Sequence, residues 1–402
     1  MIKRHQILLT LMIWATVSCS LSETGPGIRQ PGGDIWRNPA FNADSVNAEK
    51  KICYVTGLDY PEGYNWMADP EKGTVKCSLV VFAEGRPVMK LPVGKEYHVS
   101  PDPDMHRIIE GHIYTDYSTE TETIIKKDGQ ELFRYPGREM ILGMTIMESD
   151  VYTLGKPRSG EGFTYRKNGE PVVERSIGYA FPRLQHEGDT LFFAFSEPIE
   201  AVGTSHERYY HVRNGRISQV AVREDVTKVW DIIRHNGKTC YLASLTGIPS
   251  PVAVDGTRMK ALEYSQGMNM LASRLFSAGE YLGVEGICTS GSAYSSSLWK
   301  DGVRYRQFPG NMVTNGICTS QDGICCMLNP AKAGGNGIIF RCGESLTMPS
   351  GYASMGNSPI DMMDGILYAG LSSLKGNRPI LWKDGKTTEL DINGMICTLT
   401  VD

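Results

Sequence analysis

Residues 297–308 read SLWKDGVRYRQF, and residues 380–390 read ILWKDGKTTEL. In each segment a short apolar run ends in a lysine, and Asp-Gly separates it from a second run that suits a β-strand. Asp-Gly between two such runs is a strong hairpin signal, because a type I′ turn needs positive φ at both central residues. Each segment therefore predicts two antiparallel strands joined by a tight turn.

The same pattern recurs along most of the chain. The glycines of these turns are Gly85, Gly129, Gly169, Gly215, Gly256, Gly302, Gly343 and Gly385, and successive ones lie 40 to 46 residues apart. A second turn with a short aromatic or apolar strand precedes most of them, as in EGHIYT at 110–115 and DGILYAG at 364–370. Two hairpins per period give four antiparallel strands per unit, which is typical of a propeller blade.

The two ends of the repeat region complement each other. The first unit begins at residues 52–57 (ICYVTG), which match the second strand of the last unit, so its innermost strand is missing. The chain ends with one additional strand at residues 395–401 (MICTLTV). We expect this C-terminal strand to pair into the first blade, since closure removes free sheet edges. The sequence thus predicts an all-β fold, a single β-propeller over residues 50–402 with eight four-stranded blades, or seven if one repeat is an insertion.

The repeats also carry a resemblance to known proteins. Tyr-bearing second strands followed by LWKDG at 298–302 and 381–385 resemble the xYxxG…LWKDG repeats of secreted and lipid-anchored β-propeller proteins of Bacteroidetes. The resemblance covers residues 50–402. It implies the propeller fold and names no particular function.

The N-terminus has the features of an export signal. Lys3 and Arg4 precede an apolar stretch at residues 7–15, which is too short to span a membrane as a helix. Residues 16–18 (TVS) then precede Cys19, as in a bacterial lipobox. We expect residues 1–18 to be a lipoprotein signal peptide and Cys19 to be lipidated; an ordinary cleaved secretory signal is the alternative. The lipid would anchor the protein in the outer membrane, on its periplasmic side or at the cell surface.

The segment between the expected lipid and the first blade has the composition of a linker. Residues 19–49 are rich in Gly, Pro, Ser and Asn and show no sustained periodicity, which predicts a flexible tether. Its aromatic residues, Trp36 and Phe41, are candidates for docking onto the domain.

Composition narrows the class of protein further. Hydrophobic residues make up 41% and charged residues 21% of the chain, which are globular values and exclude a disordered protein. The net charge is −4, so composition gives no basis for nucleic-acid binding. The 44 glycines fit a fold with many tight turns. We expect one monomeric domain.

Nine cysteines remain after Cys19. Most of them lie in predicted strands, where a thiol behaves as a small buried apolar group. Cys53 and Cys397 are a candidate disulfide, because closure would place their strands side by side. Cys325 and Cys326 are adjacent, so their side chains should leave opposite faces of one strand. No CxxC is present, and no metal site is expected.

The longest loop of the first blade is one candidate ligand site. Tyr60, Tyr64 and Trp66 lie within seven residues of one another, beside Asn65 and Asp69. Exposed aromatic rings beside amides and carboxylates suit the apolar face and the hydroxyl edge of a sugar. The alternative is that the rings fold back as a small core that holds the loop.

The central channel is the second candidate. Its predicted inner strands carry polar residues, several of them arginines that could hold an anionic ligand such as an acidic sugar. These are Arg107, Arg183, Asp231, Arg274, Asn315, Asn357 and Asp361. The alternative is that they line a water-filled channel that binds nothing.

Catalytic and metal signatures are weak by comparison. The segment from His98 to Arg107 contains Asp102, Asp104 and His106, but its spacing matches no metal motif and its prolines enforce an extended loop. No GxSxG, HExxH or P-loop is present, and no cofactor is implied. Paired carboxylates for glycoside cleavage stay possible, because the fold sets their separation.

Three functions are compatible with these features. The first is a lipid-anchored binding protein for a glycan or a protein partner. The second is a carbohydrate-active enzyme, a hydrolase or lyase, with its site at the channel mouth. The third is a scaffold subunit of an outer-membrane complex. Two carboxylates about 5–10 Å apart with perturbed pKa values would favour the enzyme, and an extended apolar patch would favour the scaffold.

Overall fold

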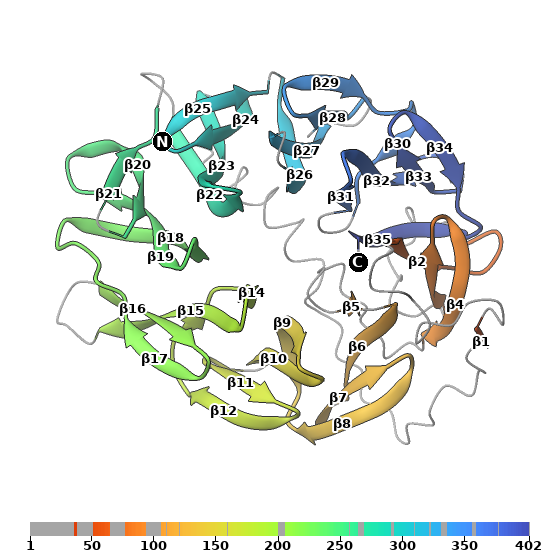
Figure 1. The fold of residues 1–402 in the computed structure, drawn as a ribbon, viewed down its shortest axis with the longest axis horizontal. Coiled ribbons are helices and arrows are strands. Elements are labelled where there is room, and N and C mark those ends of the chain that lie inside the picture. Colours follow the sequence, from red (N-terminus) through yellow and green to blue (C-terminus); the bar gives the residue numbers. More distant parts are fainter. Residues whose placement is uncertain are drawn as a thin grey trace, which may run out of the picture.

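A computed structural model gives the fold. It describes residues 36–37, 51–64, 77–93, 106–109, 111–119, 121–158, 160–199, 206–256, 258–263, 269–290, 293–308, 310–320, 323–330, 336–355, 359–376 and 378–401. The described strands form eight antiparallel blades that follow one another around a ring (Figure 1). The predicted all-β, eight-bladed propeller is therefore confirmed, and the seven-bladed alternative is wrong.

The first four blades occupy the N-terminal half of the described chain. Blade 1 contains β1 (Trp36–Arg37), β2 (Cys53–Asp59), β3 (Cys77–Ala83) and β4 (Arg86–Val93). Blade 2 contains β5 (His106–Ile109), β6 (His112–Ser118), β7 (Glu122–Lys127) and β8 (Gln130–Pro136). Blade 3 contains β9 (Glu139–Met147), β10 (Asp150–Pro157), β11 (Phe163–Lys167) and β12 (Glu170–Arg175). Blade 4 contains β13 (Tyr179–Ala180), β14 (Gln185–Glu187), β15 (Thr190–Ile199), β16 (His206–Arg213) and β17 (Arg216–Gln219).

The other four blades complete the ring. Blade 5 contains β18 (Val226–His235), β19 (Lys238–Leu245), β20 (Ile248–Asp255) and β21 (Arg258–Ala261). Blade 6 contains β22 (Asn269–Ala278), β23 (Tyr281–Ser290), β24 (Ala293–Lys300) and β25 (Val303–Gln307). Blade 7 contains β26 (Met312–Ser320), β27 (Gly323–Pro330), β28 (Ile338–Arg341) and β29 (Glu344–Thr347). Blade 8 contains β30 (Tyr352–Ala353), β31 (Ile360–Met363), β32 (Ile366–Ser373), β33 (Ile380–Lys383) and β34 (Lys386–Glu389).

The C-terminal strand closes the ring, as expected. β35 (Gly394–Val401) pairs antiparallel with β2 and becomes the innermost strand of blade 1 (Figure 1). Thr56 and Thr398 face each other in this pair, both are buried, and their hydroxyl oxygens lie 2.8 Å apart. The two ends of the repeat region are thus held together by a complete strand ladder.

The outer hairpin turns explain the repeated Asp/Asn-Gly. Asp128, Asn168, Asp301 and Asp384 all have positive φ, as do the glycines that follow them. The side-chain oxygen of each turn residue accepts a hydrogen bond from the second strand of its own blade, such as Ile113 N to Asp128 Oδ1 at 2.9 Å. The repeated residue therefore shapes the turn and also fastens it to the neighbouring strand.

The Tyr and Lys of the repeat also meet. The ammonium groups of Lys127, Lys167, Lys300 and Lys383 lie 3.5–5.7 Å from the ring centroids of Tyr114, Tyr152, Tyr281 and Tyr368, respectively. Each tyrosine lies on the second strand and each lysine on the third strand of the same blade. A cation over an aromatic face is attractive, so the repeated pair supports the blade itself.

The core lies between blades. In the part of the chain that the structure describes, each of the eight clusters of buried apolar residues joins two neighbouring blades. Blades 3 and 4, for example, share a cluster that contains Leu154, Phe163, Phe193 and Phe195. A single four-stranded sheet exposes two apolar faces, and packing in a ring buries both. Close approach also fixes glycines: a Cβ on Gly155 would overlap the Glu139 carboxylate.

The cysteines of the described chain are all free thiols. The candidate Cys53–Cys397 disulfide is wrong, because Cys53 packs in the cluster between blades 8 and 1 whereas Cys397 packs in the cluster between blades 1 and 2. Strand alternation sends the two side chains to opposite faces of the sheet. Alternation also separates Cys325 and Cys326, which enter different clusters, as expected.

Part of the expected tether pairs with the domain. β1 lies at the outer edge of blade 1, with Trp36 opposite Lys90 and Arg37 opposite Met89. The expected signal peptide and Cys19 lie outside the described residues. Among the residues that the structure describes, no helix is both long and apolar enough to cross a membrane.

Candidate functional site

A cavity of about 860 Å³ lies at the inner strands of the ring. It is lined by residues of β5, β14, β22, β23, β26, β31 and β35, together with Pro182 and Arg183 from the connection before β14. These strands belong to six of the eight blades. Figure 1 shows how the blades are arranged around the centre of the ring. Five of the predicted channel residues line it: Arg107, Arg183, Arg274, Asn315 and Asp361.

Arg274 and Glu285 form an ion pair on the cavity wall. The two residues face each other across the hairpin of β22 and β23. The side chain of Arg274 is 44% exposed, and that of Glu285 is 12% exposed. The Glu285 carboxylate raises the pKa of Arg274 further above its usual value, so this guanidinium stays charged. Glu285 was not among the predicted channel residues, although pairing the two strands outward from the turn at Gly279 places it opposite Arg274.

Arg183 and Asp231 join three blades. Arg183 Nη1 lies 3.2 Å from Asp231 Oδ2 and donates to the carbonyl oxygen of Leu275 at 3.0 Å. The buried Asp231 carboxylate also accepts the backbone N–H groups of Ile232 and Leu275. Asp231 is not among the lining residues, so its predicted place on the channel wall is wrong. It instead fixes the guanidinium of Arg183, which does line the cavity and whose side chain is 31% exposed.

Another part of the wall comes from blades 7 and 8. Asp361 accepts the backbone N–H groups of Met362 at 2.8 Å and Val401 at 3.1 Å, and burial raises its pKa despite these bonds. Asn315 donates to the carbonyl and hydroxyl oxygens of Ser354. Both side chains are therefore oriented by the scaffold.

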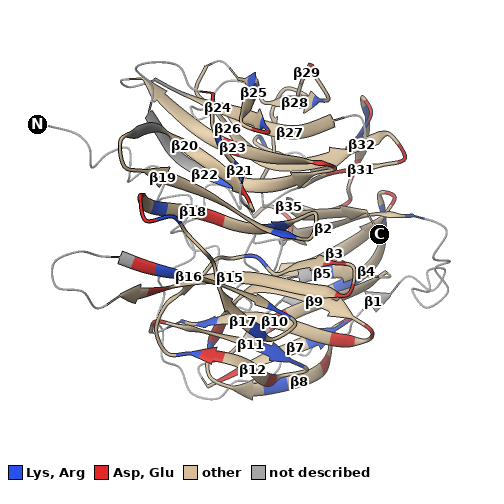
Figure 2. Cartoon of the chain, turned by 60° about the vertical axis from the view of Figure 1, so that its left-hand side comes forward, with Lys and Arg blue, Asp and Glu red and all other residues tan. Residues whose placement is uncertain are grey.

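The charges of the cavity are unequal. Among the lining residues that the structure describes, three are arginines, Arg107, Arg183 and Arg274, and two carry carboxyl groups, Glu285 and Asp361. Elsewhere both signs of charge are interspersed over the strands of the blades (Figure 2). Arg107, Arg183 and Arg274 thus differ from the other charged residues because they line one cavity. Their guanidinium groups can form several hydrogen bonds to one anion.

The predicted aromatic platform does not hold for Tyr60. Its side chain is 7% exposed and packs in the cluster between blades 1 and 2, with the ring of the half-buried Tyr64 5.3 Å away. Asn393 donates to the carbonyl oxygen of Pro61, which fastens this part of the loop. Tyr60 and Tyr64 therefore form the small loop core that was the alternative, because burying the apolar rings is more favourable than exposing them to water. Trp66 lies outside the described residues.

Several other candidates also lie outside the described residues. These are Asn65, Asp69, His98, Asp102, Asp104, Asn357 and Cys19. Of the segment from His98 to Arg107, the structure describes only His106 and Arg107, at the start of β5. Within the described part of the chain, no group of three or more His, Cys, Asp or Glu side chains is arranged to hold a metal ion.

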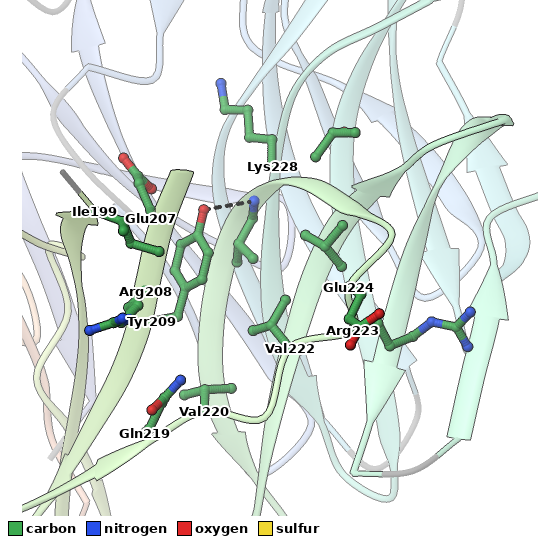
Figure 3. A pocket seen from close by; sticks show the side chains of 13 residues that line it. Ile199, Glu207, Arg208, Tyr209, Gln219, Val220, Val222, Arg223, Glu224 and Lys228 are labelled. Carbon is green, nitrogen blue, oxygen red and sulfur yellow. Dashed lines mark hydrogen bonds between the residues drawn. The ribbon is translucent and has the colours of Figure 1, made fainter. Parts of the chain in front are cut away.

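A second cavity, of about 480 Å³, lies between blades 4 and 5 (Figure 3). Tyr209 and Val222 line its apolar part, and Glu207, Arg208 and Glu224 are among its charged residues. Tyr209 accepts a hydrogen bond from Val229 N at 3.3 Å, and burial raises its pKa to about 12. Charges of both signs surround this cavity, so it offers no clear preference for one ligand.

The carboxyl groups around the central cavity already have partners. Glu285 pairs with Arg274, Asp231 with Arg183, and Asp361 with two backbone N–H groups. An acid–base pair needs one carboxyl group that can give a proton and one that can take it. The ion pairs and the backbone hydrogen bonds therefore hold each of these three carboxyl groups in a fixed orientation.

The similarity of this chain to known proteins concerns the fold alone. No family model matches the sequence, and no curated protein does either. Among solved structures, dihydro-heme d1 dehydrogenase NirN in complex with DHE is similar with a TM-score of 0.53 and 10% identity, over 90% of this chain and 76% of that one. The β-propeller domain of the Trilobed protease from Pyrococcus furiosus gives a TM-score of 0.42 and 11% identity, over 79% and 88% of the two chains.

A peptidase is also among the similar structures. The puromycin-hydrolyzing peptidase of Mycobacterium tuberculosis gives a TM-score of 0.47 and 8% identity over 72% of this chain. The chain spans only about half of that protein, 54% of its length.

Proposed function

We propose that this protein is a binding protein of the cell envelope that holds an anionic ligand, such as an acidic sugar of a glycan, in its central cavity. The observation that carries the proposal is the convergence of Arg107, Arg183 and Arg274 on one cavity of about 860 Å³. Two of these guanidinium groups are oriented by carboxylates, and both keep accessible surface toward the cavity. Guanidinium groups fixed in this way bind carboxylates and phosphates with directional bonds.

The proposed anchor is the lipid on Cys19 in the outer membrane. The support is the sequence alone: a positive N-terminus, an apolar stretch at 7–15 and a lipobox-like 16–19. A Cys19→Ala variant should fold normally and leave the membrane fraction, whereas retention of that variant in the membrane would contradict the lipid anchor.

The ligand is tested on residues 20–402 with an array that contains uronic-acid, sialylated, sulfated and neutral glycans. We expect binding to acidic glycans only, and at least tenfold weaker binding by Arg107→Gln and Arg183→Gln. The matched control is Arg134→Gln, because Arg134 is an exposed arginine on β8 that pairs with Glu131 and Glu122. Equal binding of neutral glycans, or equal losses in the control, would overturn the proposal.

The scaffold alternative has less support. Exposed large apolar residues such as Leu132, Val172, Met259 and Val303 are spread over the outermost strands of four blades. An interface that holds an assembly together would favour one contiguous patch.

A further inference from the structure

Blade 7 departs from the other blades at its outer turn. The turn residue is Cys342, where blades 2, 3 and 8 have Asp128, Asn168 and Asp384. Its backbone keeps the arrangement of the other blades, with a φ of 45° and a hydrogen bond from Cys342 N to Ile324 O at 3.1 Å. Left-handed backbone is unfavourable for a residue with a Cβ, and the oxygen that fastens the turn in those blades is absent from this side chain. A thiol has thus replaced a structural oxygen.

The thiol of Cys342 contacts another thiol. Cys342 Sγ lies 3.3 Å from Cys325 Sγ on β27, and 3.9 Å from Ser320 Oγ. Cys318 on β26 is the direct cross-strand neighbour of Cys325. The three cysteines therefore follow one another across blade 7, on the face that packs against blade 8. Cys326 is on the other face and takes no part in this row.

Access to the row is graded. Cys325 is fully buried, whereas Cys342 and Cys318 are half-buried, and Cys318 lines the central cavity. A hydrogen bond from Cys318, and to a lesser extent one from Cys342, holds the pKa of Cys325 below its usual value, although burial opposes this effect. The thiolate is the form that attacks a disulfide. The buried middle cysteine is consequently the group that can complete an exchange begun at its accessible neighbour.

We propose that Cys325 and Cys342 are an oxidisable dithiol that takes low-molecular-weight disulfides as its oxidant. The Cys342 thiolate attacks the external disulfide, forms a mixed disulfide and releases one small thiol. The Cys325 thiolate then attacks the Cys342 sulfur, forms the Cys325–Cys342 bond and releases the second small thiol. Two protein thiols are oxidised, one external disulfide is reduced to two thiols, and the two protons of the protein thiols pass to the leaving groups.

The test uses the purified protein with oxidised glutathione as the probe. After incubation, free thiols are alkylated in denaturant and peptides are mapped by mass spectrometry. We expect a Cys325–Cys342 crosslinked peptide that dithiothreitol removes, with Cys53, Cys240 and Cys397 still alkylated. Alkylation of both Cys325 and Cys342 after oxidation, glutathione that stays on Cys342, or a Cys318–Cys325 link instead would overturn the proposal.

Two variants separate chemistry from folding. Cys342→Asp gives blade 7 the turn residue of blade 2, where Asp128 occupies this position, and blade 3 has the similar Asn168. This variant should therefore fold with an unchanged or higher melting temperature and lose the crosslink. Cys326→Ala removes the adjacent thiol on the opposite face and should keep the crosslink. A crosslink to Cys325 that survives Cys342→Asp, or loss of the crosslink in folded Cys326→Ala, would contradict the assignment.

Discussion

The hydroxyl pair that joins the two ends of the repeat region allows a quantitative test of ring closure. Thr56 and Thr398 lie 342 positions apart in the sequence, and their side chains are 0% and 4% exposed. Thr56 Oγ1 is 2.8 Å from Thr398 Oγ1 and also accepts the Thr398 backbone N–H at 3.2 Å. Replacement of Thr56 by Val keeps the shape of the side chain and removes both bonds.

The expected cost follows from the number of buried partners affected. A hydrogen bond contributes about 1 kcal/mol net, and a buried group that loses its partner costs about 1–3 kcal/mol. Thr398→Val removes one bond and should lower the free energy of unfolding by about 1 kcal/mol. Thr56→Val also deprives the backbone N–H of Thr398, so about 2–3 kcal/mol is expected. The double variant should cost less than the sum, because the two losses share one bond.

The assay is urea unfolding, followed by tryptophan fluorescence and circular dichroism. We expect the midpoints to fall in the order wild type, Thr398→Val, Thr56→Val, with an unchanged slope. Thr387→Val on the exposed β34 is the matched control and should leave the midpoint unchanged. If Thr56→Val unfolds at the same urea concentration as this control, the argument that buried closure contacts hold the ring is refuted.

Three further predictions follow from other contacts. Deletion of residues 395–402 removes the inner strand of blade 1 with buried Ile396 and Leu399, so the melting temperature should fall sharply; an unchanged value would refute the closure scheme. Arg166 and Glu139 form a buried ion pair at 2.9 Å. Arg166→Met should therefore lower the free energy of unfolding by about 3–5 kcal/mol, measured by chemical unfolding. Arg223→Met removes the exposed pair with Asp225 and should change this free energy little. Burial raises the pKa of Asp361, so folding favours the protonated form of this carboxyl group. The wild type should therefore lose stability relative to Asp361→Asn as the pH rises from about 4 toward 7. A constant difference in unfolding free energy between the two proteins across that range would contradict this.

The sequence predicted the strands and turns well because these depend on local chemistry. Asp-Gly and Asn-Gly select the turn, and apolar alternation selects the strand, so the blade period appears directly in the residue order. The two unmatched ends, at 52–57 and 395–401, were sufficient to predict the closing strand pair. Arg183 and Arg274 could be assigned to the cavity wall because they lie in or next to inner strands.

Errors arose where a side chain has a choice of environment. The sequence of the loop that contains Tyr60 suggested an exposed aromatic platform. The Tyr60 ring is instead buried beside Tyr64 and Leu58, because burial of an aromatic ring is more favourable than its exposure to water. Asp231 was expected on the cavity wall and instead lies behind Arg183, because a buried carboxylate needs the hydrogen bonds that Leu275 and Ile232 provide. Glu285 was overlooked because its significance depends on a partner in the preceding strand.

By itself, the sequence determined the all-β class and the number of strands per blade, since hydrogen-bonded ladders and turns are set within each repeat. It also determined the closure of the ring, since the strands at 52–57 and 395–401 each lack a partner in their own repeat. The tertiary structure alone decided which polar groups converge. Arg183, Asp231 and Leu275 come from three different blades, and Cys325 meets Cys342 only through the pairing of β27 with β28. The first meeting depends on how neighbouring blades pack around the ring, and the second depends on the register of one strand pair, and neither can be read from the residue order.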